Sequence, residues 1–144
     1  MNYKHTQIGY LVIFALLGTI LLFGTILMQE DLNYPILVFM ILILLLLSSF
    51  VTLQVTLDER YLKIKFGYGI YRKSFLLQEI ISVKTVRNHW YYGWGIRVWF
   101  WPYMLIYNIS GFDAVEIRMK NNKIYRIGTD EPKKLEQAIT QAIR

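Results

Sequence analysis

Residues 53–77, LQVTLDERYLKIKFGYGIYRKSFLL, alternate apolar and polar side chains in three blocks, separated by the turns DER and GYG. In the middle block Leu62, Ile64 and Phe66 share one face, and Tyr61, Lys63 and Lys65 share the opposite face, as expected for a strand. The two glycines of GYG suit a tight turn because glycine adopts positive φ readily. The stretch therefore predicts three consecutive strands with one apolar face.

The rest of the carboxyl-terminal part continues this pattern. A helical turn and a fourth strand are predicted over residues 76–86, and further strands over residues 104–110, 114–119 and 123–128. Leu135, Ala138, Ile139, Ala142 and Ile143 then form the single apolar stripe of an amphipathic helix. About seven strands followed by one helix predict a small antiparallel barrel or sandwich that the helix closes.

The amino-terminal part is apolar throughout. Residues 8–28 and 36–53 contain no charged side chain, and the first of these runs, as a helix, would be about 31 Å long, close to the thickness of a bilayer core. The connector QEDLNYP at residues 29–35 is short, which requires an antiparallel pair. We therefore predict a two-helix transmembrane hairpin at residues 1–53 and a separate domain at residues 54–144.

The charges predict the orientation of this hairpin. Of the 16 lysines and arginines, all except Lys4 follow the second apolar run, whereas the connector carries Glu30 and Asp31 and no basic residue. The positive-inside rule then places both termini in the cytoplasm of a multi-pass protein of the cell membrane. The absence of cysteine fits a reducing compartment.

Residues 88–104, NHWYYGWGIRVWFWPYM, contain all four tryptophans. Their alternation predicts a strand whose Ile96, Val98 and Phe100 face the core. Tryptophan and tyrosine concentrate at membrane interfaces, so the opposite face and the flanking loop predict a membrane or partner interface made of six residues: Trp90, Trp94, Arg97, Trp99, Trp101 and Tyr103. Too few basic residues lie among the rings for stacking on nucleic acid, and the pattern leaves open whether lipid or a partner's helix covers them.

Lys63, Lys65, Arg72 and Lys73 form a second candidate site. Close to an anionic leaflet they would attract lipid headgroups, although they also suit the solvated face of a strand pair. The two histidines, His5 and His89, lie far apart in sequence and no cysteine is present, so no catalytic, metal or cofactor site is predicted.

Three segments resemble a known family: GIYRKSFLLQEIISVK (residues 69–84), YGWGIR (92–97) and YNISGFDAVEIRMKNNKIYRIGTDEPKKLEQAI (107–139). They are similar to small bacterial membrane proteins in which a pleckstrin-homology-like (PH-like) domain follows two membrane spans. The likeness extends over residues 51–144. It implies a PH-like fold at the cytoplasmic membrane surface, without an established activity, and some relatives occur near bacteriocin genes as immunity proteins.

Together these observations predict an α+β membrane protein: a transmembrane hairpin, a seven-stranded PH-like barrel or sandwich, and a carboxyl-terminal helix. The expected function is non-catalytic binding of a protein partner or lipid at the membrane surface, possible partners being the bilayer, another protein or a second copy of the chain. The alternative is an accessory subunit of a membrane transporter or enzyme complex.

Overall fold

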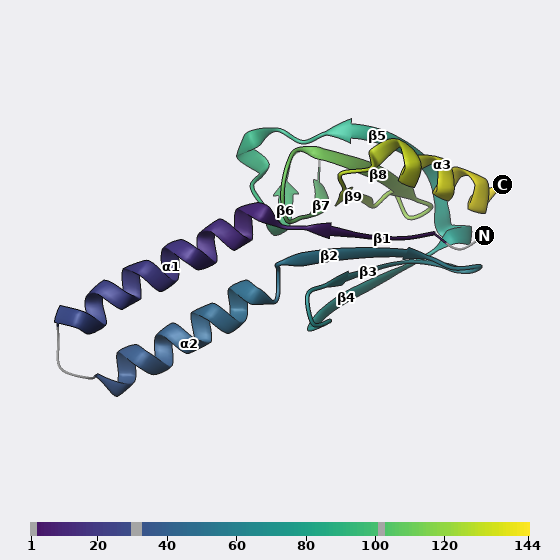
Figure 1. Ribbon diagram of the computed structural model, residues 1–144. Coiled ribbons are helices and arrows are strands. Elements are labelled where there is room, and N and C mark those ends of the chain that lie inside the picture. The colour runs from purple at the N-terminus through teal and green to yellow at the C-terminus, as the bar shows by residue number, and fades with distance from the viewer. Residues whose placement is uncertain (1–2, 30–32, 101–102) are drawn as a thin grey trace.

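A helical hairpin extends from one end of a β-rich domain in the computed structural model, which describes residues 3–29, 33–100 and 103–144 (Figure 1). Helix α1 covers Tyr10–Gln29 and helix α2 covers Tyr34–Ser48. Neither helix has a buried residue, and Phe23 and Phe39 pack edge to face between them with ring centroids 6.3 Å apart. The hairpin is therefore apolar and projects away from the rest of the protein.

The second helix is shorter than the sequence indicated. It ends at Ser48, and strand β2 begins at Thr52, so the predicted span over residues 36–53 is wrong at its carboxyl end. The hydroxyl of Ser49 donates to the carbonyl of Leu46, and the Val51 carbonyl accepts from the Gly9 N–H at 2.6 Å, which ties the chain to the start of α1. Within the described residues α1 alone is long and apolar enough to cross a membrane.

The first sheet has four antiparallel strands in the order β1-β2-β3-β4: Tyr3–Ile8, Thr52–Leu57, Tyr61–Phe66 and Tyr71–Leu76. The alternation predicted for residues 61–66 is confirmed, since Leu62, Ile64 and Phe66 are buried. Strand β1 was not predicted. It pairs with β2 along its whole length, from Tyr3 opposite Leu57 to Ile8 opposite Thr52.

The second sheet has five strands in the order β5-β8-β9-β7-β6: Ile80–Arg87, Asp113–Met119, Ile124–Gly128, Tyr103–Asn108 and Gly95–Phe100. The tight β8–β9 turn, where Asn122 has φ 66°, places β9 between β8 and β7. As a result β9 runs parallel to β7, and the prediction of a wholly antiparallel sheet is wrong. Within the described residues the strands number nine rather than seven, and the two sheets do not form a closed barrel.

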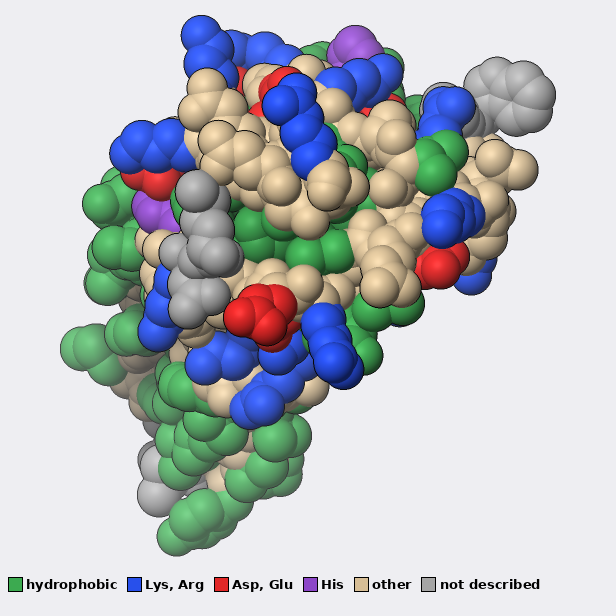
Figure 2. Space-filling model, turned by 90° about the vertical axis from the view of Figure 1, so that its right-hand side faces the viewer, with side chains coloured by type: hydrophobic (Ala, Val, Ile, Leu, Met, Phe, Trp, Pro, Cys, Tyr) green, Lys and Arg blue, Asp and Glu red, His purple; other side chains and the backbone are tan. Residues whose placement is uncertain are grey.

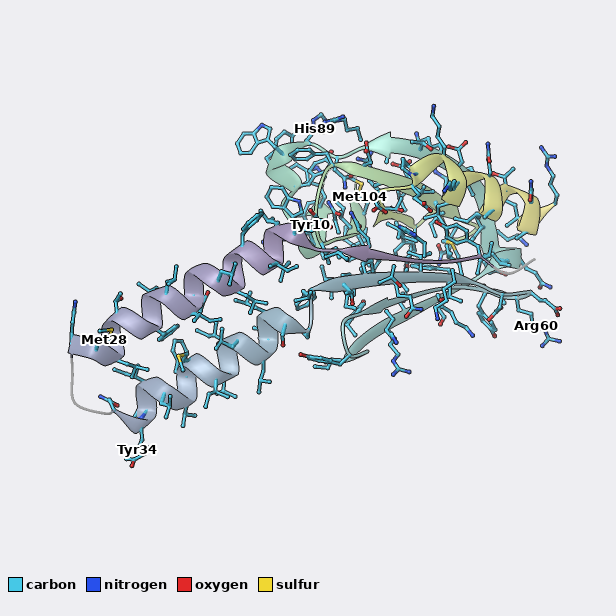
Figure 3. All side chains as sticks on the ribbon, viewed as in Figure 1. Tyr10, Met28, Tyr34, Arg60, His89 and Met104 are labelled. Atoms are coloured by element: carbon cyan, nitrogen blue, oxygen red, sulfur yellow. The ribbon has the colours of Figure 1, made fainter. Side chains whose placement is uncertain are left out.

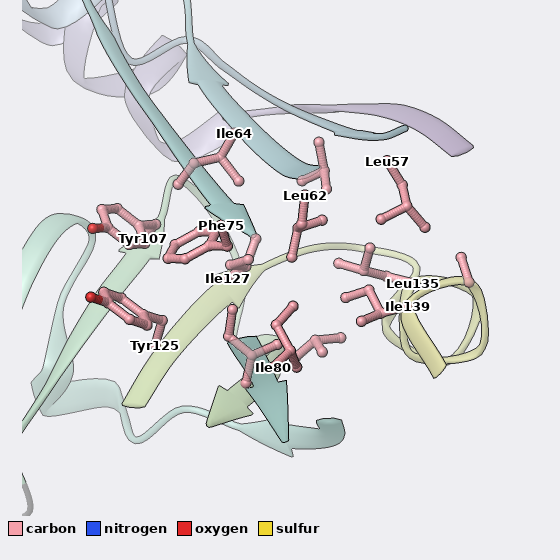
Figure 4. Close-up of a cluster of buried hydrophobic side chains, with 14 of the residues drawn as sticks. Leu57, Leu62, Ile64, Phe75, Ile80, Tyr107, Tyr125, Ile127, Leu135 and Ile139 are labelled. Carbon is pink, nitrogen blue, oxygen red and sulfur yellow. The ribbon is translucent and has the colours of Figure 1, made fainter. Parts of the chain in front are cut away.

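The two sheets enclose one main core (Figure 4). The first sheet contributes Leu57, Leu62, Ile64 and Phe75, and the second contributes Tyr107, Tyr125 and Ile127. Helix α3 (Pro132–Ile143) closes one side with Leu135, Ala138 and Ile139, and Ile143 packs against the core, which confirms the predicted apolar stripe except at Ala142, which is exposed. Desolvation raises the pKa of Tyr107 above the usual tyrosine range, and the Tyr71 hydroxyl 3.4 Å away adds to the shift.

Strand β1 also joins the two halves of the domain. The imidazole of His5 lies between two carboxylates at the start of α3, with Nε2 2.5 Å from Asp130 Oδ1 and Nδ1 3.4 Å from Glu131 Oε2. Burial raises the pKa of Tyr3 to about 12, and the nearby Glu131 carboxylate contributes to that shift. Because β1 leads into α1 after Gly9 alone, these contacts couple the hairpin to the first sheet and to the start of α3.

Candidate functional site

The tryptophan-rich segment forms a 3-10 helix, η2 (Trp90–Tyr92), followed by strand β6. Gly93 and Gly95 have φ values of 74° and 92°, so glycine permits the turn that connects the two elements. Strand β6 is the last strand of its sheet and, among the described residues, pairs only with β7. An edge strand of this kind has one neighbour, which leaves more of its side-chain surface open.

A second, smaller apolar cluster lies beside this edge. Its buried members are Tyr92, Met104 and Ile106, and Trp99 and Ile124 pack against them. The ring of Trp99 lies 4.7 Å from that of Tyr92 and 5.4 Å from that of Tyr91, measured between centroids. Trp99 is therefore half-buried in a protein cluster, and its predicted place on the open face is not observed.

The predicted inward face of β6 is wrong for two of its three residues. Ile96 packs against the main core, but Val98 is 42% exposed and Phe100 is 78% exposed. The physical reason is that an apolar cluster lies on each face of β6. On one face the main core contacts only Ile96, and on the other face the second cluster contacts Trp99. Alternation alone does not distinguish these two situations.

The remaining predicted interface residues divide into packed and open side chains. Trp94 is half-buried, and its Nε1 donates to the Gly111 carbonyl at 3.1 Å. Arg97 is exposed, with its Nε donating to the Trp94 carbonyl at 2.9 Å. Trp90 and Tyr103 are open, at 75% and 57% exposure. Trp101 lies outside the described residues.

The open side chains belong to the end of the domain from which the hairpin leaves. Strands β6 and β7 lie at that end in Figure 1, and Figure 3 labels His89, next to η2, at the same end as Tyr10, the first residue of α1. Arg60 marks the opposite end (Figure 3). We call the exposed residues Trp90, Tyr91, Val98, Phe100 and Tyr103 the aromatic edge.

The turn between β3 and β4 adds apolar residues that the sequence analysis did not select. Tyr68 and Ile70 are 67% and 78% exposed, and the Tyr68 hydroxyl donates to Ser48 Oγ at 2.9 Å, at the end of α2. The turn therefore lies beside the base of the hairpin. The sequence could have indicated this contact, because two apolar residues stand in a glycine turn and such turns are usually polar.

The basic residues predicted to bind headgroups do not all share one face. Lys63, Lys65 and Arg72 lie on the outer face of the first sheet, with Lys65 opposite Arg72 across the β3–β4 pair. Lys73 falls on the other face, where its Nζ lies 5.9 Å from the ring centroid of Tyr125. The structure thus brings three of the four together.

Lys63 is also engaged by a carboxylate. Its Nζ lies 2.7 Å from Asp58 Oδ2, and this hydrogen bond, with the backbone N–H groups of Arg60 and Tyr61, lowers the pKa of Asp58 to about 2. Lys65 and Arg72, which are closer to the β3–β4 turn, make no ion pair with any described residue. Their charges are therefore the ones available near the base of the hairpin.

The opposite end of the domain has a different character. Seen from that end, Lys and Arg side chains are spread over the domain surface, and the apolar hairpin projects behind it (Figure 2). The molecule thus has an apolar end that continues into the hairpin and a charged end that faces away from it.

Comparison with known proteins provides no further assignment. No protein-family model matches the chain, and no curated protein matches it significantly.

Proposed function

We propose that this protein is a non-catalytic, membrane-anchored module whose PH-like domain binds a protein partner or lipid at the cytoplasmic membrane surface. The observation that carries the proposal is the apolar hairpin, which has no buried residue in either helix. At 1.5 Å per residue the 20 residues of α1 extend for about 30 Å, the thickness of a bilayer core. Apolar surface of this size is stable in lipid and costly in water.

The pairing of β1 with β2 supports a hairpin that returns to the side from which it entered. Strand β1 precedes α1 and strand β2 follows α2, and the two strands are hydrogen-bonded neighbours. If α1 crosses the bilayer, α2 must cross back, because the strands on either side of the hairpin, β1 and β2, belong to one sheet. The 15 residues of α2 extend for only about 22 Å, so the bilayer thins locally or the flanking residues complete the path.

The aromatic edge and the β3–β4 turn then lie at headgroup depth. Trp90, Tyr91 and Tyr103 combine an apolar ring with a polar N–H or O–H group, which suits the boundary between hydrocarbon and water. Lys65 and Arg72, beside the turn, can reach anionic headgroups from the same end. An immunity or membrane-stress role follows from the family resemblance, as one form of such partner binding.

Topology is tested with reporter fusions to the full chain. The distribution of lysine and arginine predicts that a reporter after Arg144 is active only in its cytoplasmic form and that one inserted at Leu32 is active only outside the membrane. The reverse pattern would contradict the orientation and the proposed partners with it.

Membrane placement of the aromatic edge is tested by tryptophan quenching in vesicles. Lipids labelled at shallow depth should quench the parent protein, and Trp90→Phe should lose more of this quenching than the control Trp94→Phe, since Trp94 is half-buried. Equal losses of quenching in the two variants would contradict the placement of the aromatic edge at the membrane interface. A stoichiometric subunit retained through purification in mild detergent would favour the accessory-subunit alternative.

A further inference from the structure

A cleft of about 390 Å³ opens beside the aromatic edge and has no role in the function proposed above. It is lined by Arg87, Asn88, His89, Trp90 and Phe112, from the end of β5, the start of η2 and the loop before β8. Figure 3 labels His89 at the end of the domain from which α1 leaves. The cleft therefore lies at the level of the aromatic edge, where lipid headgroups would be found.

Arg87 supplies the cleft with a cation that is free to bind an anion. It is exposed, and its Cζ lies 5.7 Å from the ring centroid of Phe112, which orients the guanidinium. Asp113 stands opposite Arg87 in the β5–β8 ladder, but within the described residues Arg87 forms no ion pair. A guanidinium of this kind presents two parallel N–H groups, the geometry that phosphate oxygens accept best.

Asn88 supplies an unused donor. Only 5% of the residue is exposed; its N–H donates to the Phe112 carbonyl at 2.7 Å, and its Oδ1 accepts from Arg126 Nη1 at 3.2 Å. The first bond fixes the backbone and the second holds the side chain in place, yet its Nδ2 is buried and has no acceptor among the described residues. An unsatisfied buried N–H is unfavourable, and because Asn88 lines the cleft, a ligand oxygen that reached Nδ2 would relieve it.

We propose that this cleft binds a phosphate group, with Arg87 pairing its charge, Asn88 Nδ2 donating to one oxygen, and Trp90 covering the carbon attached to it. The chemistry is that of a phosphorylated headgroup whose apolar part continues toward the bilayer. The proposal rests on the placement of the aromatic edge at the membrane, because that placement brings headgroups to the cleft. Lys65 and Arg72 lie on the other sheet and form no part of it.

The test uses the full chain in a neutral detergent with nitrogen-15 in its tryptophan indoles. Titration with sn-glycerol 3-phosphate should shift the Trp90 indole signal in a saturable manner and leave that of Trp99, which packs in the second apolar cluster, in place. Arg87→Gln should weaken binding by about tenfold or more, the usual effect of losing a charged hydrogen bond. The matched control is Arg118→Gln, which removes the same charge from an exposed position on β8 and should leave binding unchanged.

Two further arms identify the source of the phosphate. A Trp90 signal that shifts in nanodiscs containing phosphatidylglycerol, relative to phosphatidylcholine, assigns the cleft to a lipid headgroup, whereas a response to inorganic phosphate alone assigns it to a free anion. No saturable shift in any arm, or equal weakening by the two arginine variants, would overturn the proposal. Quenching of Trp90 by labelled lipid does not require Arg87, so Arg87→Gln protein that is still quenched separates a failed phosphate site from a failed membrane placement.

Discussion

Replacing Trp99 and Phe100 one at a time tests which face of strand β6 packs against the rest of the protein. The two residues are adjacent and both aromatic, yet Trp99 packs on Tyr92 and the second apolar cluster, while Phe100 is 78% exposed. Removing Trp99 should therefore destabilise the fold, and removing Phe100 should not.

The structure gives the size of each effect. Truncating a fully buried tryptophan to alanine costs about 3–5 kcal/mol. Trp99 is half-buried, so we expect Trp99→Ala to lower the free energy of unfolding by about 2 kcal/mol, part of it from the ring contacts with Tyr91 and Tyr92. Phe100→Ala should stay within about 0.5 kcal/mol, as is usual for an open surface position.

Thermal unfolding of the full chain in mild detergent, followed by circular dichroism of the sheets, measures both variants. A loss of about 2 kcal/mol should lower Tm by roughly 5–10 °C, and Phe100→Ala should melt with the parent. In vesicles the two substitutions should affect membrane contact in the opposite order. Phe100→Ala removes membrane contact, whereas Trp99→Ala, at temperatures where it is folded, does not. An unchanged Tm for Trp99→Ala together with a lowered Tm for Phe100→Ala would refute this description of β6.

Three further substitutions test other parts of the fold. A Cβ on Gly67, where φ is 48°, would lie 2.3 Å from the Ser49 carbonyl oxygen, so Gly67→Ala should lower Tm by several degrees; Gly24→Ala, whose Cβ meets no atom within 4 Å, is the control. Glu116 is almost fully buried and its Oε2 accepts from Arg126 Nε at 2.9 Å, so Glu116→Ala should cost about 3 kcal/mol in denaturant unfolding by leaving that guanidinium unpaired; a loss below 1 kcal/mol would show that the pair is solvated. Because folding lowers the pKa of Asp58 from 3.8 to about 2, its contribution to stability is present above 3.8 and is lost as the pH falls toward 2; over that range the parent should therefore lose more Tm than Asp58→Asn, and parallel pH profiles would contradict the assignment.

The sequence alone determined the elements whose evidence is local. The alternation at Leu62, Ile64 and Phe66 predicts a strand with one buried face, and the spacing of Leu135, Ala138 and Ile139 predicts a helix with one buried stripe; the structure confirms both. The uncharged runs likewise predicted two apolar helices. In each case the strand or helix period recurs within a few residues, and only one face of the element packs against an apolar neighbour.

Tertiary structure decided what depends on residues distant in the sequence. The segment Tyr3–Ile8 has little apolar character of its own and becomes strand β1 because β2, beyond the whole hairpin, supplies its hydrogen-bond partners. The same packing brings His5 to Asp130 and places Arg87 and Asn88 in one cleft with Phe112. The faces of β6 could not be predicted from its alternation because apolar clusters lie on both sides of this edge strand. An alternation with a period of two residues predicts that neighbouring side chains point in opposite directions. Only the packing of the two sheets and η2 decides which side chains face the core and which stay exposed.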